Sequence, residues 1–318
     1  MSILATILPL FTLIALGFIS IKSGYVAAEQ IRPVGEFVLK IALPALIFNA
    51  LTEVPLGEAV DWRFVLGFGA ASLGVFVTGM FAAVSLSRAP LGEAGMMGLG
   101  MSASNSGFMG YPIALSVIGS TAAPMLAQCM LIENLLMIPL AIAIVEITRA
   151  EKGSGMAHAI ATSLGQVGRN PILIALCAAL LVSALGIPVP GFISRSIEML
   201  AGIASPIALF VIGGTVASLP MAGLYRRISL IVFGKLVLHP LAVFLVLSAI
   251  PEINPVTLAS GVIFASVPML SIFPLLGQRA GIQMLSASAL LAATAVSFAT
   301  ITLTLMILES TFSFLPRG

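Results

Sequence analysis

The sequence predicts an all-α integral membrane protein of ten transmembrane helices, arranged as two inverted five-helix repeats, and three observations support this fold class. Of the 318 residues, 59% are hydrophobic and only 8% are charged, whereas a soluble domain carries about 25% charged residues. The apolar residues also fall into ten stretches, most of them as long as a bilayer requires. Finally, the two halves of the chain repeat each other at one fixed offset.

Short segments rich in glycine, proline and charged residues separate the ten apolar stretches. The longest polar segment divides the chain into a first five-helix repeat (1–148), a cytoplasmic loop (149–170) and a second five-helix repeat (171–318). The ten predicted spans cover residues 3–21, 34–52, 63–86, 94–118, 122–147, 171–186, 193–219, 228–250, 256–279 and 282–308.

The basic residues predict the orientation, because lysine and arginine collect on the cytoplasmic side of a membrane. With the N-terminus outside, nine basic residues fall inside and three outside. We therefore expect a multi-pass protein of the cell inner (plasma) membrane, with both termini outside and the central loop in the cytoplasm. The inside set is Lys22, Arg32, Arg88, Arg149, Lys152, Arg169, Arg226, Arg227 and Arg279, and the outside set is Arg63, Arg195 and Arg317.

An internal repeat appears when the chain is shifted by 162 residues, because three prolines then fall on three others without a gap. Each half holds five predicted spans, an odd number, so the halves would have opposite orientations in the membrane. Inverted repeats of this kind are typical of secondary transporters. The aligned pairs are Pro9 with Pro171, Pro44 with Pro206, and Pro112 with Pro274.

The fourth and ninth spans are each interrupted by polar residues, glycine or proline. Pro112 cannot donate a backbone hydrogen bond, and Gly107 permits unwinding. Two interruptions at matching positions predict a binding site near the bilayer midplane, where the positive ends of half-helices suit an anion. The alternative, a pair of proline kinks without a ligand, is weakened by the asparagine and serines beside them. The predicted substrate-binding residues are Ser104, Asn105, Ser106, Gly107, Tyr111, Pro112, Ser266, Val267, Pro268, Ser271 and Pro274.

Charged groups inside a membrane are costly and often functional. Glu133, with Asn134 and Gln128 nearby, lies within the fifth span and is the first candidate for ion coupling. It could carry a proton or form part of a cation site, or it could be a structural partner of Lys235 or of another helix. Lys235 shares a helix face with His239. It could attract an anion, but we favour a side chain that extends to the inner membrane surface.

Other polar residues have simpler interpretations. Glu36 and Lys40 lie four residues apart, which favours a local ion pair. Cys129 and Cys177 lie in apolar stretches and are expected to be small buried residues, not a disulfide or a metal pair. We find no catalytic, metal-binding or nucleotide-binding motif, so we expect no enzyme and no cofactor apart from a coupled proton or sodium ion. The basic residues form no dense run, which argues against nucleic acid as a partner.

The sequence resembles the auxin efflux carrier family, which includes the plant PIN carriers and bacterial homologues assigned to malonate transport. The resemblance covers nearly the whole chain and is carried by the opening span and by residues 43–49, 105–112 and 266–268. It implies a fold like that of bile-acid sodium symporters and NhaA-type antiporters. It also implies a scaffold domain from spans 1, 2, 6 and 7, a transport domain from spans 3–5 and 8–10, an elevator movement and a homodimer through the scaffold.

By the same resemblance, Asn105 is the crossover asparagine, and Pro112 with Pro268 or Pro274 are the crossover prolines. One departure is that Val267 occupies the position equivalent to Asn105, so the two interruptions differ chemically. The function predicted is secondary transport of small organic anions, such as malonate-like dicarboxylates or auxin-like acids. Direction and coupling ion stay open. The alternatives are a sodium-coupled organic-anion symporter and a membrane receptor that binds its ligand without moving it.

Overall fold

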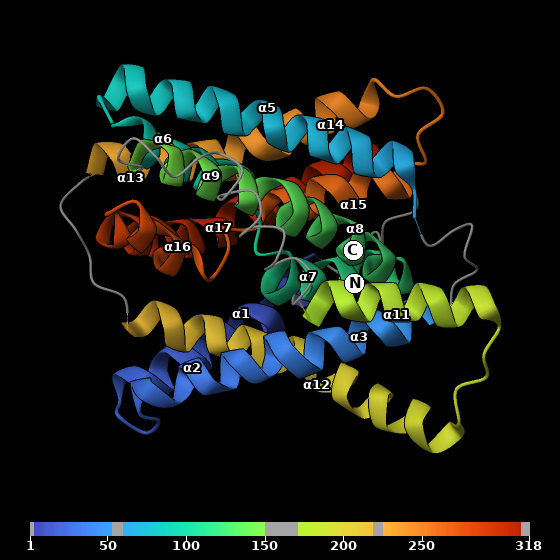
Figure 1. Cartoon of the computed structure of the whole chain (residues 1–318). Coiled ribbons are helices and arrows are strands. Elements are labelled where there is room, and N and C mark those ends of the chain that lie inside the picture. Colours follow the sequence, from blue (N-terminus) through green and yellow to red (C-terminus); the bar gives the residue numbers. More distant parts are fainter. Residues whose placement is uncertain (1–2, 53–59, 150–170, 219–224, 313–318) are drawn as a thin grey trace.

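The computed structural model describes residues 3–52, 60–149, 171–218 and 225–312, and within these ranges the chain forms helices and no strand (Figure 1). Helices occupy each of the ten predicted apolar stretches, and the fourth and ninth stretches are each interrupted. The α-helices of the first half are α1 (Ile3–Lys22), α2 (Ala28–Phe37), α3 (Leu43–Thr52), α5 (Trp62–Ser87), α6 (Leu91–Ser102), α7 (Tyr111–Ile118), α8 (Ala122–Ile132) and α9 (Ile138–Arg149). Those of the second half are α11 (Pro171–Leu185), α12 (Gly191–Ser218), α13 (Tyr225–Phe233), α14 (His239–Ser248), α15 (Pro255–Ser266), α16 (Phe273–Arg279) and α17 (Gln283–Thr311).

Four α-helices are preceded by one wide π-helical turn, which in three cases joins them directly to the helix before. These turns cover Val38–Ala42, Ser106–Gly110, Glu133–Met137 and Gly234–Leu238. A π-turn adds one residue to the helical ladder and often occurs at functional positions. Three of the four hold a polar residue of the predicted site or one of its charged neighbours: Ser106, Glu133 and Lys235.

Six helical segments of the described chain are long and apolar enough to cross a membrane, by length and composition. Three shorter apolar helices, Leu8–Lys22, Pro171–Leu185 and Pro255–Ser266, accompany them. The chain is therefore built as a multi-pass membrane protein, while ten crossings with inverted halves stay a prediction. The central loop lies outside the described residues from residue 150 onwards. The six segments are Ala28–Thr52, Trp62–Ser87, Leu91–Thr148, Gly191–Ser218, Tyr225–Ser248 and Gln283–Thr311.

The helices form two groups that lie one above the other in Figure 1. In the lower group, α1 packs along α12, and α3 packs against both α11 and α12. In the upper group, α5 contacts α6 and α14, α14 contacts α15, and α16 contacts α17. The interrupted helices belong to the upper group, and α7 and α8 lie next to the lower one.

Glycines allow α1 and α12 to pack with their backbones in direct contact. A Cβ atom on Gly213 would overlap the carbonyl oxygen of Ile14, and one on Gly17 would overlap the carbonyl oxygen of Phe210. Small residues at helix crossings are the usual means of close packing in membranes, where dispersion contacts replace the hydrophobic effect. This crossing therefore sets how closely α1 and α12 pack within the lower group.

The second helical stretch begins six residues earlier than predicted, at Ala28, because the N-terminal turn is closed locally. The backbone N–H of Ala27 donates to Oε1 of Gln30 at 3.2 Å. Pro33 is accommodated near the start of this helix, so it does not end it. The predicted ion pair is confirmed, with Nζ of Lys40 2.8 Å from Oε2 of Glu36.

The two cysteines differ in their surroundings. Cys129 is buried as predicted, but the prediction for Cys177 is wrong because its side chain is exposed. The reason is helical periodicity: Ile174 and Leu181 lie three and four residues away on α11 and are also exposed. Cys177 therefore belongs to an outward-facing apolar stripe.

Candidate functional site

Two helices of the upper group are interrupted where the sequence predicts. Helix α6 ends at Ser102, the chain is extended at Ala103 and irregular at Asn105, and helical structure resumes at Ser106. Helix α15 ends at Ser266, Val267 is extended, and α16 begins at Phe273. Each interruption leaves backbone groups that lipid cannot satisfy, so these groups need partners within the protein.

The two interruptions contact each other through Asn105. Its backbone N–H donates to the carbonyl oxygen of Pro268 at 2.8 Å, and its side-chain Nδ2 donates to Oγ of Ser271 at 2.7 Å. Glycine permits this approach, because a Cβ atom on Gly110 would lie 2.7 Å from the ring of Phe264. The two predicted halves of the site are thus in direct contact, although 166 residues separate Asn105 from Ser271.

The start of the second half-helix is occupied by a carboxylate of the protein itself. Oε1 of Glu133 accepts hydrogen bonds from Oγ of Ser106 at 2.7 Å and from the backbone N–H of Ser104 at 3.1 Å. The side chain is buried at 2% exposure. A negative charge is favourable at a helix N-terminus. The positive end that we expected to be open to an anionic ligand is therefore already filled in this conformation.

Oε2 of Glu133 is the unsatisfied atom of this carboxylate. It is buried and has no hydrogen-bond partner among the described residues. A buried oxygen without a donor is costly. Binding of a proton or a cation at this atom would therefore stabilise the buried carboxylate most.

Lys235 lies in the same network, and our preference for a side chain reaching the membrane surface is wrong. Its side chain is completely buried, and Nζ donates to Oγ of Ser104 at 2.7 Å, to Nδ1 of His239 at 2.8 Å and to the carbonyl oxygen of Ala265 at 2.7 Å. These three acceptors use all three ammonium protons. Lys235 thus has no proton left for a substrate, which argues against direct attraction of an anion.

The network continues from Lys235 into a third helix. Nε2 of His239 lies 3.0 Å from Oγ of Ser72 on α5, and both side chains are completely buried. Because Lys235 donates to Nδ1, the proton of the neutral imidazole is assigned to Nε2, which donates to Ser72. Glu133, Ser104, Lys235, His239 and Ser72 form one continuous hydrogen-bonded chain across the upper group.

Sequence reasoning missed this role of Lys235 because the predicted span starts too late in the chain. Helix α13 begins at Tyr225, three residues earlier than predicted, which places Lys235 ten residues from the helix start. Ten helical residues rise about 15 Å, half the thickness of the hydrocarbon core. A lysine at that depth is more easily satisfied inside the protein than at the surface.

The remaining predicted coupling residues bond to other parts of the chain. Oε1 of Gln128 accepts from the backbone N–H of Asp61 at 2.9 Å, at the start of α5. Nδ2 of Asn134 donates to the carbonyl oxygen of Met130 in its own helix at 2.8 Å. Of the three predicted coupling residues, Glu133 is the one shown to bond to residues of the first interruption.

The predicted substrate-binding residues gather at the two interruptions but differ in access. Ser104 and Ser106 are 0% and 1% exposed, whereas Asn105 is 6% exposed. The serines are engaged with Lys235 and Glu133, so Asn105 is the most exposed of these three polar side chains, although it too is largely buried. Gly107 is needed for packing, because a Cβ atom there would lie 2.9 Å from Cδ1 of Leu43. Tyr111, Pro112, Ser266, Val267 and Pro268 are buried, and Ser271 and Pro274 are partly buried.

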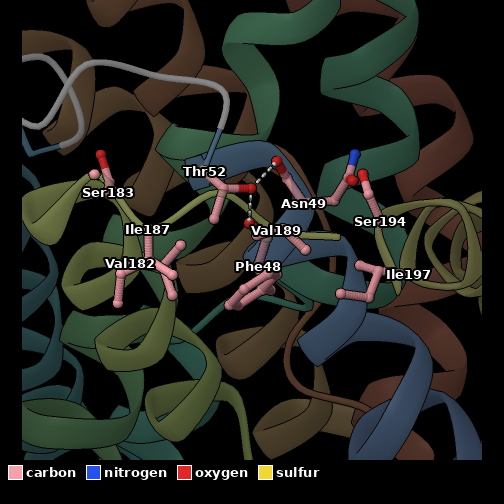
Figure 2. Close-up of a pocket in the computed structure, with 10 residues that line it drawn as sticks. Phe48, Asn49, Thr52, Val182, Ser183, Ile187, Val189, Ser194 and Ile197 are labelled. Atoms are coloured by element: carbon pink, nitrogen blue, oxygen red, sulfur yellow. Dashed lines mark hydrogen bonds between the residues drawn. The ribbon is translucent and has the colours of Figure 1, made fainter. Parts of the chain in front are cut away.

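A cavity of about 350 Å³ lies in the lower group, between α3, the end of α11 and the start of α12 (Figure 2). Asn49, Thr52, Ser183 and Ser194 supply its polar groups, and the Thr52 hydroxyl donates to backbone oxygens of Phe48 and Asn49. Among the residues that the structure describes, none of those lining the cavity is charged. It can therefore hold a neutral molecule more readily than a carboxylate.

Comparisons with known proteins agree with this architecture. A family model described as "Membrane transport protein" matches residues 2–307. The "Putative malonate transporter" of Rhizobium meliloti is 30% identical over 96% of this chain and 95% of its own length. The "Uncharacterized transporter YfdV" of Escherichia coli is 24% identical over 76% of both chains. The "Lysosomal cholesterol signaling protein" of Mus musculus is 27% identical over 76% of this chain but 28% of its own.

Proposed function

Because the chain belongs to the membrane transport protein family, that of the auxin efflux carriers, we propose that it is a secondary transporter of small organic anions. Membership makes it a multi-pass membrane transporter and not an enzyme. The observation that carries the proposal is the contact of the two helix interruptions through Asn105. The substrate class proposed is a carboxylate, such as a malonate-like dicarboxylate or an auxin-like acid, and the name of the Rhizobium meliloti relative supports it.

Asn105 is the proposed substrate contact in the first interruption. One N–H of its amide is used by Ser271, which leaves a second N–H for a carboxylate oxygen. The Ser271 hydroxyl lies beside it and can donate to the same ligand. Glu133 repels an anion from the helix start, so the substrate would bind on the Asn105 side of the crossing and not among the buried serines.

The proposed mechanism is an elevator movement, in which the upper group of helices carries the substrate past the lower group. The packing of α1, α3, α11 and α12 with one another supports a scaffold built from these helices. The glycine crossing of α1 and α12 supports it further, because a rigid element is needed for the other group to move against. We also propose that the scaffold forms a homodimer in the plasma membrane.

Glu133 is the proposed coupling residue. Its unsatisfied Oε2 favours either a proton or a cation at this position. Proton coupling needs only this carboxylate, while sodium coupling needs further oxygen ligands around it. A sodium-coupled symporter is therefore the alternative, and a measurement with and without sodium separates the two.

Thermal stabilisation of the purified protein by mono- and dicarboxylates tests the substrate class. A ligand that binds the folded protein raises its Tm by mass action. We expect malonate or a related carboxylate to do so, and we expect Asn105→Ala to weaken this binding about tenfold or more, since a hydrogen bond to a charged group is lost. Repeating the series with and without sodium, at two pH values, identifies the coupling ion.

Asn49→Ala is the matched control, because Asn49 is also an asparagine of an apolar helix but lines the cavity of the lower group. We expect this variant to retain carboxylate binding. Loss of binding in Asn49→Ala with full binding in Asn105→Ala would move the site to the lower cavity. Binding without uptake in proteoliposomes would instead favour a receptor.

A further inference from the structure

A second cavity, of about 730 Å³, opens between the end of α5 and the start of α13, at the left of Figure 1. Three arginines line it: Arg88 follows α5, and Arg226 and Arg227 lie in the first turn of α13. It lies at the Leu91 end of α6, whereas the helix interruption follows the other end of that helix at Ser102. Twelve helical residues separate these ends by about 18 Å. This cavity is thus distinct from the proposed substrate site.

The cavity carries more positive charge than the described residues around it neutralise. Arg227 is held in place by Oε2 of Glu93 at 3.0 Å and by the carbonyl oxygen of Ser87 at 3.1 Å. Arg88 and Arg226 form no ion pair with any residue that the structure describes. Within the described ranges, one carboxylate thus balances three guanidinium groups. Arginine forks match the oxygens of a phosphate group in a bidentate manner, so an anionic phosphate is a suitable ligand.

The surfaces beside the cavity are apolar and outward-facing. Phe81 and Leu86 on α5 are 72% and 53% exposed, and Phe233 on α13 is 52% exposed. Tyr225, in the cavity lining itself, is 70% exposed. Tyrosines are enriched at the boundary between lipid tails and headgroups. A ligand with a charged head and long apolar chains would therefore match both the cavity and its surroundings.

We propose that this cavity binds the phosphate headgroup of an anionic phospholipid. Arg88 and Arg226 contact the phosphate, Arg227 and Glu93 hold the cavity open, and the acyl chains lie along the exposed faces of α5 and α13. Basic pockets between membrane helices on the cytoplasmic side are suited to such headgroups. The inference does not depend on the identity of the transported substrate.

The test compares phosphatidylglycerol with phosphatidylcholine, which shares the phosphate but carries no net charge. Each lipid is added to the detergent-purified protein, and lipid retained on the protein is counted by native mass spectrometry beside the Tm. We expect phosphatidylglycerol to bind and to raise the Tm, and phosphatidylcholine not to. The double variant Arg88→Gln with Arg226→Gln should weaken phosphatidylglycerol binding about tenfold or more. Because it leaves Arg227 and Glu93 in place, it should retain the fold.

Arg63→Gln is the matched control, because Arg63 is an exposed arginine at the opposite end of α5. It removes one positive charge, as Arg226→Gln alone does, and should leave lipid binding unchanged. Unaltered phosphatidylglycerol binding in the double variant, or equal binding of the two lipids, would overturn the proposal. An equal rise in Tm from inorganic phosphate alone, lost in the double variant, would replace the lipid with a free anion. If the double variant does not fold, Arg226→Gln alone provides the same comparison.

Discussion

Glu133 and Lys235 have opposite charges and share Ser104 without contacting each other. The Ser104 backbone N–H donates to Glu133, and its hydroxyl accepts from Lys235. Each charge also lies at a helix end of the opposite sign. Glu133 binds at the positive start of the helical segment after the first interruption. Lys235 binds a carbonyl oxygen at the negative C-terminal end of α15. The cost of interrupting two helices in the membrane is thus offset by one carboxylate and one ammonium group.

Replacement of Glu133 by glutamine separates a coupling role from a structural one. The amide oxygen of Glu133→Gln can still accept from Ser104 and Ser106, so the half-helix start stays satisfied, but the side chain can no longer exchange a proton or balance a cation. We expect transport in proteoliposomes to lose its dependence on pH or sodium. Glu36→Gln, which alters an exposed ion pair, should leave that dependence intact.

An unchanged ion dependence in Glu133→Gln would make Glu133 a structural partner of the crossing. That alternative, which the sequence leaves open, predicts a different result: a lowered Tm with normal coupling. The loss would be several kcal/mol if the buried Lys235 charge were left uncompensated, about 3–5 kcal/mol by comparison with other buried pairs. Transport and Tm measured on the same variant therefore distinguish the two roles.

Glycine positions decide how closely whole helices pack, and α12 provides a matched pair. At Gly213 a Cβ atom would overlap the carbonyl oxygen of Ile14, whereas at Gly202 nothing lies within 4 Å. We expect Gly213→Ala to force α1 and α12 apart and to cost about 1–3 kcal/mol. Gly202→Ala should be neutral or stabilising by up to about 1 kcal/mol, because alanine favours the helix. Thermal unfolding in detergent measures both, and equal effects would contradict a close-packed scaffold crossing.

Elements were more predictable from the sequence than the contacts between them. Hydropathy identified all ten helical stretches, and proline with glycine identified both interruptions, because these residues act through their own backbone. The partners of Lys235 could not be predicted in the same way. Ser104 and Ala265 lie 131 and 30 residues away in the chain, and only tertiary packing brings them within reach. For the same reason Gln128 seemed close to Glu133 in sequence, yet it binds the start of α5 instead.

At the scale of the whole molecule, the glycines with positive φ support the proposed repeat. They are Gly24, Gly119, Gly186 and Gly281. Gly24 and Gly186 are 162 residues apart, as are Gly119 and Gly281, which is the offset that aligns the prolines. Each pair ends a helix in equivalent positions of the two halves, and glycine is favoured there because other residues rarely adopt a left-handed conformation.

If the halves are inverted, the equivalent turns at Gly24 and Gly186 must lie on opposite sides of the membrane. We test this with single cysteines beside them, Ser23→Cys and Ile187→Cys, in a chain whose Cys129 and Cys177 are changed to serine. Both positions are exposed. The bias of basic residues predicts that a membrane-impermeant thiol reagent labels Ile187→Cys in right-side-out vesicles and Ser23→Cys only after permeabilisation. The reverse labelling pattern would keep the inverted repeat but flip its orientation in the membrane. Labelling of both cysteines from one side would exclude the inverted repeat. It would also exclude the symmetry on which an elevator movement around a central helix crossing depends.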